Sequence, residues 1–179
     1  MKNARKVLLL VLCLVLVVSA TVMGTLAYLT DKTEEVVNTF TIGNINITLD
    51  ESEGLDLKMV PGKTITKDPK ATVLPNSEKC YLFVKVEKSS NFDDFMTYEM
   101  AEGWTALDSA NGVYYRVVES GATNQEFQIL KGDHVNVKDT VTKAQMDALT
   151  EPTYPTLTFT AYAVQFEGVS TPADAWAKL

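Results

Sequence analysis

The chain has 179 residues, with 23 acidic side chains against 16 basic ones and a formal net charge of −7 at pH 7. This excess of acid argues against nucleic acids and anionic membranes as partners, because lysine and arginine supply the attraction to both. The single histidine, His134, and the two cysteines rule out a zinc site of the HExxH, triple-histidine or Cys/His-cluster type.

The N-terminus has the order of features that a secretory signal peptide shows. Three basic residues within the first six precede the 12-residue apolar run 7–18, which is shorter than the roughly 20 residues of a membrane-spanning helix. Small side chains follow, and we expect cleavage between Ala27 and Tyr28. Ser19-Ala20 is an alternative site, and retention of the uncharged segment as a membrane anchor is an alternative outcome.

Cleavage at that point removes 27 of the 179 residues and leaves 152, with 13 basic side chains against 23 acids and a formal charge of −10. A domain of this length buries roughly 70% of the surface that its unfolded chain exposes, which suffices for one core. Cys13 leaves with the signal peptide, so an internal disulfide is impossible. We expect Cys80, in a strand-like run, to be a small buried hydrophobic residue.

Alternation of apolar and polar residues, rich in β-branched side chains, predicts strands along most of the remaining chain. The first covers 36–49, with a bulge or bend at Gly43-Asn44. A turn is expected at Pro61-Gly62. The other predicted strands cover residues 55–60, 64–66, 80–87, 96–100, 113–118, 126–130 and 156–166.

Helical signals are few and local. Thr142 opens a capping box with Gln145, and Thr171 with Pro172 forms a second helix start. Residues 91–95 fit a loop or one helical turn. Seven or eight strands without βαβ alternation predict an all-β protein, an antiparallel, jelly-roll-like β-sandwich with one or two short helices.

Three groups of residues are candidates for chemistry, and each has a structural explanation that we favour. His134 lies on an exposed-looking stretch without a paired serine motif. The acidic spots are expected to be solvated loop charge, with a weak calcium site as the alternative; they are Glu34-Glu35, Asp50-Glu51 with Glu53, and Asp93-Asp94. Four aromatic residues are expected to pack in or over the core rather than form a carbohydrate-binding face; they are Trp104, Tyr114, Tyr115 and Trp176.

The residues around the expected cleavage site, Thr25-Leu26-Ala27-Tyr28-Leu29-Thr30-Asp31, are followed by Val37-Asn38-Thr39-Phe40-Thr41-Ile42-Gly43. An Ala-Tyr/Phe-x-Asp junction before an x-Asn-x-Phe-x-x-Gly strand resembles the N-terminus of the TasA/camelysin family, which Gram-positive bacteria export through a SipW-type signal peptidase. Shorter motifs extend the resemblance along the chain, including Val60-Pro61-Gly62-Lys63, Gly112-Val113-Tyr114-Tyr115 and Ala161-Tyr162-Ala163-Val164-Gln165.

The resemblance implies a secreted jelly-roll subunit of an extracellular biofilm-matrix or cell-surface fibre. In such fibres the N-terminal segment of one subunit inserts as a donor strand into the sheet of the next. Residues 28–43 would be that segment and residues 44–179 the sandwich domain. The contacts to the next subunit would come from Tyr28, Leu29, Val37, Thr39, Phe40 and Ile42. The implied partners are further copies of this chain in a head-to-tail homopolymer, the SipW-type signal peptidase and an accessory anchor protein, without nucleic acid.

Two other functions stay open. One is a monomeric cell-surface binding module or adhesin. The other is the metalloprotease activity described for camelysin, which a single histidine and the lack of zinc-ligand spacing do not support. We therefore expect a protein that is not an enzyme and that holds no cofactor or metal.

Overall fold

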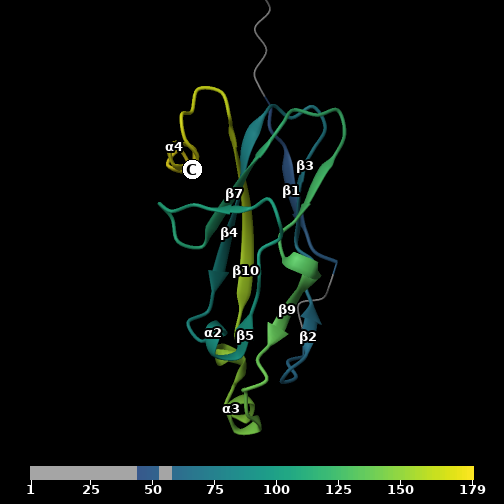
Figure 1. Cartoon of the computed structure of the whole chain (residues 1–179), viewed down its shortest axis with the longest axis vertical. Helices are drawn as coiled ribbons and strands as arrows, with labels where there is room; N and C mark the ends of the chain where they lie inside the picture. The colour runs from purple at the N-terminus through teal and green to yellow at the C-terminus, as the bar shows by residue number, and fades with distance from the viewer. Residues whose placement is uncertain (1–43, 53–57) are drawn as a thin grey trace, which may run out of the picture. The chain divides into compact units, whose positions relative to one another are not determined.

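The structure is a computed structural model that describes residues 44–52 and 58–179, all within the unit Ile42–Leu179 (Figure 1). The predicted signal peptide and the N-terminal segment 28–43 lie outside the described residues. The described part consists mainly of antiparallel β-strands with a few short helices. The prediction of an all-β sandwich is confirmed.

The largest sheet has four antiparallel strands in the order β10-β4-β7-β6. The two long strands are β4 (Cys80–Lys88) and β10 (Leu157–Gln165), each of nine residues. On the other side of β4 lies β7 (Val113–Val118), and the two-residue strand β6 (Thr105–Ala106) pairs with β7.

Two smaller sheets of three antiparallel strands each pack against the four-stranded sheet. Their orders are β1-β3-β8 and β2-β9-β5. The strands are β1 (Ile47–Asp50), β2 (Thr64–Thr66), β3 (Lys70–Val73), β5 (Met96–Thr97), β8 (Gln125–Gln128) and β9 (His134–Val137).

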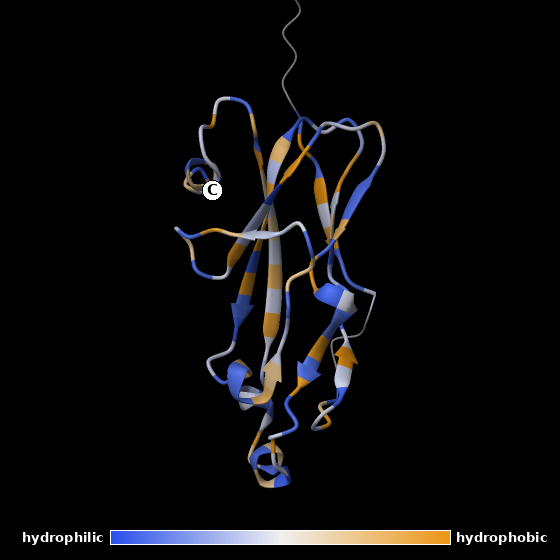
Figure 2. Cartoon of the chain, viewed as in Figure 1, coloured by the Kyte–Doolittle hydropathy of each residue, from blue (hydrophilic) through white to orange (hydrophobic). Residues whose placement is uncertain are grey.

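The inner face of the four-stranded sheet forms the main core. Strand residues two apart share a face, so alternate residues of β4 point inward, namely Cys80, Leu82, Val84 and Val86. They pack against Ala71 and Val73 of β3 and Ile129. Figure 2 shows the resulting alternation of apolar and polar residues along the strands. A second cluster around Phe92, Leu130 and Val135 continues the core under the sheet β2-β9-β5.

The outer face of the same sheet is also covered. Tyr81 and Phe83 of β4 point outward and meet the C-terminal helix α4 (Pro172–Trp176). The Trp176 ring lies 5.4 Å from the Phe83 ring and 5.3 Å from the Tyr162 ring, measured between centroids. This helix therefore joins β4 and β10 from outside the sandwich.

The other helical elements are equally short. They are α2 (Phe92–Phe95), α3 (Lys143–Asp147) and the 3₁₀ turns Lys131–Asp133 and Glu151–Thr153. The predicted helix starts are confirmed: Thr142 forms its capping box with Gln145, and the Thr171 side chain accepts a hydrogen bond from the Asp174 N–H. No helix in the described ranges is both long and apolar enough to cross a membrane.

Several details differ from the sequence prediction. The described residues contain ten strands rather than seven or eight, and three α-helices rather than one or two. Three short strands were not predicted, namely β3, β6 and β9. The strand predicted over 126–130 begins and ends earlier, at Gln125 and Gln128, and that over 96–100 ends at Thr97. Residues 58–60 of the strand predicted over 55–60 form no strand, and residues 53–57 are not described.

Candidate functional site

The residues to which the sequence assigns cleavage and strand donation lie outside the described residues. They are Ala27, Tyr28, Leu29, Val37, Thr39, Phe40 and Ile42. The described chain starts at Asn44, whose carbonyl accepts a hydrogen bond from the Glu78 N–H at 3.0 Å. Asn44 thus lies beside the β3–β4 turn, and the Phe166 N–H, directly after β10, donates to the Lys79 carbonyl in the same turn.

Strand β10 forms one edge of the four-stranded sheet. It pairs with β4 along its whole length, from Leu157 opposite Lys88 to Gln165 opposite Cys80. Within the described part of the chain, no other strand pairs with it. Because alternate residues of an antiparallel strand bond to opposite sides, half of its backbone groups point away from β4.

Two flanking hydrogen bonds identify those backbone groups. The Ser89 N–H donates to the Thr156 carbonyl at 3.1 Å, and the Phe166 N–H donates to the Lys79 carbonyl at 2.9 Å. In this register the even-numbered residues of β10 bond to β4. The odd-numbered residues therefore direct their N–H and C=O groups to the free edge, and these residues are Leu157, Phe159, Ala161, Ala163 and Gln165.

The free edge has none of the usual protection against further pairing. Exposed edge strands commonly carry charges, prolines or bulges that block another strand. The sequence of β10, LTFTAYAVQ, has no charged residue, no proline and no glycine, and its register with β4 is unbroken. Figure 2 shows no strongly hydrophilic residue along the middle of this strand.

Strand β1 lies next to this edge. It pairs with β3 alone among the described strands, so none of them pairs with its second edge. Ile47 and Leu49 of β1 contact the same inner core as Phe159 and Ala163 of β10. A further strand paired with β10 would add its inward side chains to that core, because residues opposite each other on paired strands share a face.

The residues proposed for metal binding or catalysis are not brought together. The His134 ring is partly exposed on β9, with Nδ1 2.8 Å from the Gly132 carbonyl oxygen. The described carboxylates of the acidic spots make local contacts. Glu51 forms an ion pair with Lys67, and Asp93 forms one with Lys88. The Asp50 carboxylate accepts a hydrogen bond from the Thr48 hydroxyl.

A catalytic metal needs several converging ligands. The part of the chain that the structure describes contains no group of three or more His, Cys, Asp or Glu side chains placed to hold a metal ion. The chain's single histidine leaves no second imidazole for a zinc site of the metalloprotease type. The described residues therefore do not fit a catalytic zinc ion.

The remaining candidates belong to the core, as expected. Cys80 is completely buried at the start of β4, and burial raises the pKa of its thiol to about 11. Trp104 and Tyr114 pack against the inner core, whereas Tyr115 and Trp176 pack against the outer one. The four aromatic residues thus lie on opposite faces of the sheet and share no binding face.

A small hollow of about 290 Å³ lies beside the end of β4. Its lining includes Lys88, Asp93, Tyr98 and Tyr114. Burial, together with the neighbouring Tyr114, raises the pKa of Tyr98. The Tyr98 phenol is therefore not ionised at neutral pH, and the Lys88–Asp93 ion pair at the rim leaves no free charge to bind a ligand.

The alternation in the sequence predicts β10 as a strand but does not predict its position at the edge of the sheet. The available signal was a nine-residue alternating strand without a charge, which is unusual for a strand that borders solvent. No sequence motif singles out Arg116 on β7, the only arginine among the described residues.

Comparison with known proteins gives one match. Residues 2–77 match the family described as camelysin metallo-endopeptidase. No curated protein and no solved structure is found to be similar to the chain. The matched range includes the N-terminal motifs and continues through β1, β2 and β3. This match supports the resemblance to the TasA/camelysin family over residues 2–77.

Proposed function

We propose that this protein is a secreted structural subunit of an extracellular biofilm-matrix or cell-surface fibre. In this proposal the segment 28–43 of one copy pairs with the free edge of β10 in the next copy. The observation that carries the proposal is the nine-residue, uncharged edge of β10, for which the described residues offer no partner strand.

The chemistry of the segment suits that edge. An added strand gains affinity from main-chain hydrogen bonds and specificity from alternate side chains. Residues 36–42 alternate, with Phe40 and Ile42 on one side, and these apolar side chains fit the half-buried core that Phe159 and Ala163 of β10 border. Cleavage between Ala27 and Tyr28 would release the segment for pairing.

This arrangement accounts for growth into fibres. The donated segment and the accepting edge are different surfaces of the same chain, so the contact is heterologous. Heterologous contacts that do not close into a ring extend without limit. Assembly would thus need no second protein for elongation, and an accessory protein would serve only as anchor or starting point.

The donor side is tested by deleting residues 28–39 from the exported protein. We expect the deletion variant to keep its circular-dichroism spectrum and thermal transition, because the described contacts begin at Asn44. It should sediment as a monomer, while the complete exported chain forms filaments under the electron microscope. Filaments from the deletion variant would contradict strand donation by this segment.

The acceptor side is tested by hydrogen exchange. In the monomer, the amides of Phe159, Ala161 and Ala163 should exchange much faster than those of Thr160 and Tyr162, because only the even-numbered residues bond to β4. In filaments all five amides should be protected. If the odd-numbered amides keep exchanging rapidly in filaments, another edge accepts the segment.

Metalloprotease activity is the second candidate, and the description of the matched family favours it. Hydrolysis of casein by the exported chain, measured with and without a chelator, tests it directly. Chelator-sensitive hydrolysis that H134A abolishes would establish the protease, because His134 is the only histidine available as a ligand. We expect no hydrolysis.

A further inference from the structure

The side chain of Arg116 occupies an unusual place between the sheets. Arg116 lies opposite Leu82 in the pairing of β7 with β4, and Leu82 belongs to the inner core. The guanidinium therefore extends from the inner face of the four-stranded sheet toward β8. Its central carbon lies 3.9 Å from the centre of the Phe127 ring and 5.4 Å from that of Trp104.

The two rings hold the guanidinium in a fixed frame. The Trp104 Nε1–H donates to the Gln128 carbonyl of β8 at 2.8 Å, which fixes the orientation of the indole. Gly103 has a φ of +85°, and a Cβ placed there would lie 3.0 Å from one terminal nitrogen of Arg116. A glycine at this position thus leaves the room that the guanidinium occupies.

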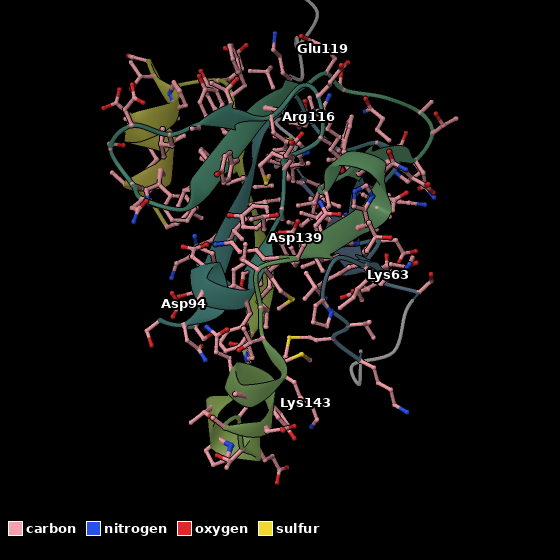
Figure 3. The ribbon with its side chains drawn as sticks, turned by 60° about the horizontal axis from the view of Figure 1, so that its bottom comes forward. Lys63, Asp94, Arg116, Glu119, Asp139 and Lys143 are labelled. Atoms are coloured by element: carbon pink, nitrogen blue, oxygen red, sulfur yellow. The ribbon has the colours of Figure 1, made fainter. Side chains whose placement is uncertain are left out.

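This cation has no anionic partner in the described part of the chain. All seven described ion pairs use lysine. Glu119, which lies beyond Arg116 at the end of β7 (Figure 3), is paired with Lys79 at 2.8 Å. The Arg116 Nε is buried without a hydrogen-bond partner, whereas the side chain as a whole is partly exposed.

We propose that Arg116, framed by Trp104 and Phe127, is a binding site for a carboxylate group. The two terminal N–H pairs of a guanidinium form a planar fork that matches the two oxygens of a carboxylate. The rings displace water from the flanks of the fork, so an anion at its open end meets a weakly hydrated cation. The inference is independent of fibre assembly and goes beyond it.

Charge on the rest of the molecule selects the kind of ligand. A chain with 23 acidic residues against 16 basic ones repels polyanions such as nucleic acids. A single carboxylate brings one negative charge and fits one arginine. Two sources supply this group: a free carboxylic acid, or an acidic side chain of a second copy.

The test uses NMR of the ¹⁵N-labelled exported chain, at a concentration where it sediments as a monomer. The spectrum of R116K assigns the Arg116 Nε–H signal, because the chain contains two arginines, Arg5 and Arg116. Sodium propionate is then titrated against sodium chloride of equal ionic strength. We expect saturable shifts of the Arg116 Nε–H and Trp104 indole signals with propionate, absent with chloride.

R116K and W104F are the matched variants. R116K keeps the charge but loses the fork, and we expect it to weaken propionate binding by about fivefold or more, as the loss of a charge-assisted hydrogen bond would. W104F keeps a ring without the anchoring N–H and should weaken binding less. Thermal melting of both variants verifies that they are folded.

A dilution series without propionate separates the two sources. If the Arg116 signal moves with protein concentration, the carboxylate comes from a second copy. If it moves only with propionate, a free acid is the ligand. The proposal is overturned if the Arg116 signal moves with neither, or if R116K responds to propionate like the unsubstituted chain. In that case the Arg116 side chain only fills the space between the sheets.

Discussion

Strands β4 and β10 have the same length and are paired along all nine residues, yet they differ in their environment. The first five residues of β4 are buried without exception, whereas no residue of β10 is fully buried. The charges are distributed the other way round. Strand β4 contains Lys85, Glu87 and Lys88, and β10 contains no charge.

This difference shows that burial here follows the position in the sheet and not the polarity of the strand. Strand β4 lies between two neighbours and has a covered face on each side, so it can end in charged residues. Strand β10 has the composition of an internal strand and the position of an edge strand. A second neighbour for β10 would remove this contradiction.

Proline substitutions should separate the two strands most clearly. Val84 lies in the middle of β4, and the Val86 N–H bond to the Gly112 carbonyl shows that even-numbered residues of β4 bond to β7. V84P should therefore destabilise the protein by about 3 kcal/mol or more, or prevent folding. The Ala161 N–H faces the free edge, so A161P should cost about 1 kcal/mol.

Urea unfolding of the two variants measures this difference, and A161P has a second use. If A161P unfolds as easily as V84P, the Ala161 N–H is used inside the monomer and β10 is no free edge. A folded A161P variant that fails to form filaments would support β10 as the accepting strand, because proline removes an N–H that an incoming strand needs.

Truncation of the cross-strand pair Phe83 and Tyr162 tests the contrast in side-chain packing. Both rings contact Trp176 at similar distances, but Phe83 is fully buried and Tyr162 is half-buried. F83A should cost about 3–5 kcal/mol, as for other buried phenylalanines. Y162A should cost about 1–2 kcal/mol, because less apolar area leaves water in the native state. Equal losses in chemical unfolding would refute the burial difference.

The pH dependence of stability should reveal the burial of Cys80 at the start of β4. Burial raises the pKa of Cys80 to about 11, while an unfolded thiol titrates near its ordinary value of about 8.5. Above that pH the unfolded chain loses its proton first, so stability falls as the pH rises toward 11. The loss should amount to about 3 kcal/mol by pH 11.

The difference between the unsubstituted chain and C80A isolates this thiol from other groups that titrate at high pH. Both proteins are unfolded in urea from pH 8 to pH 11. The free energy of unfolding of the unsubstituted chain should fall relative to that of C80A across this range. A constant difference between the two would mean that the thiol is accessible to solvent.

Much of the fold was predictable because its signals are local. The alternation in β4 and β10 and the capping residues Thr142 and Thr171 each lie within a few neighbouring residues, and the structure confirms them. Strand β3 was missed because Lys70–Val73 is short and has three buried residues in succession, which hides its alternation. The polar residues around His134 predict an exposed stretch in place of β9, but Val135 and Val137 are buried there.

The candidate site was not predictable in the same way. A strand is an edge strand only because of which strands lie beside it, and these partners are distant in sequence: Gln165 lies opposite Cys80. The place of Arg116 depends likewise on Trp104 and Phe127, which belong to different parts of the chain. Local patterns identify the elements, whereas these two features arise from long-range pairing.

The contact of α4 with the outer face of the sheet affects when the protein can fold during its synthesis. Strand β10 and α4 come from residues 157–176, so a growing chain that has reached only residue 156 lacks both the partner of β4 and the cover of Phe83. Until then the aromatic face of β4 stays open to solvent or to a chaperone. The late arrival of these residues would keep this part of the chain unfolded for most of its synthesis. That would suit the proposed export, because a narrow translocation channel admits only an unfolded chain.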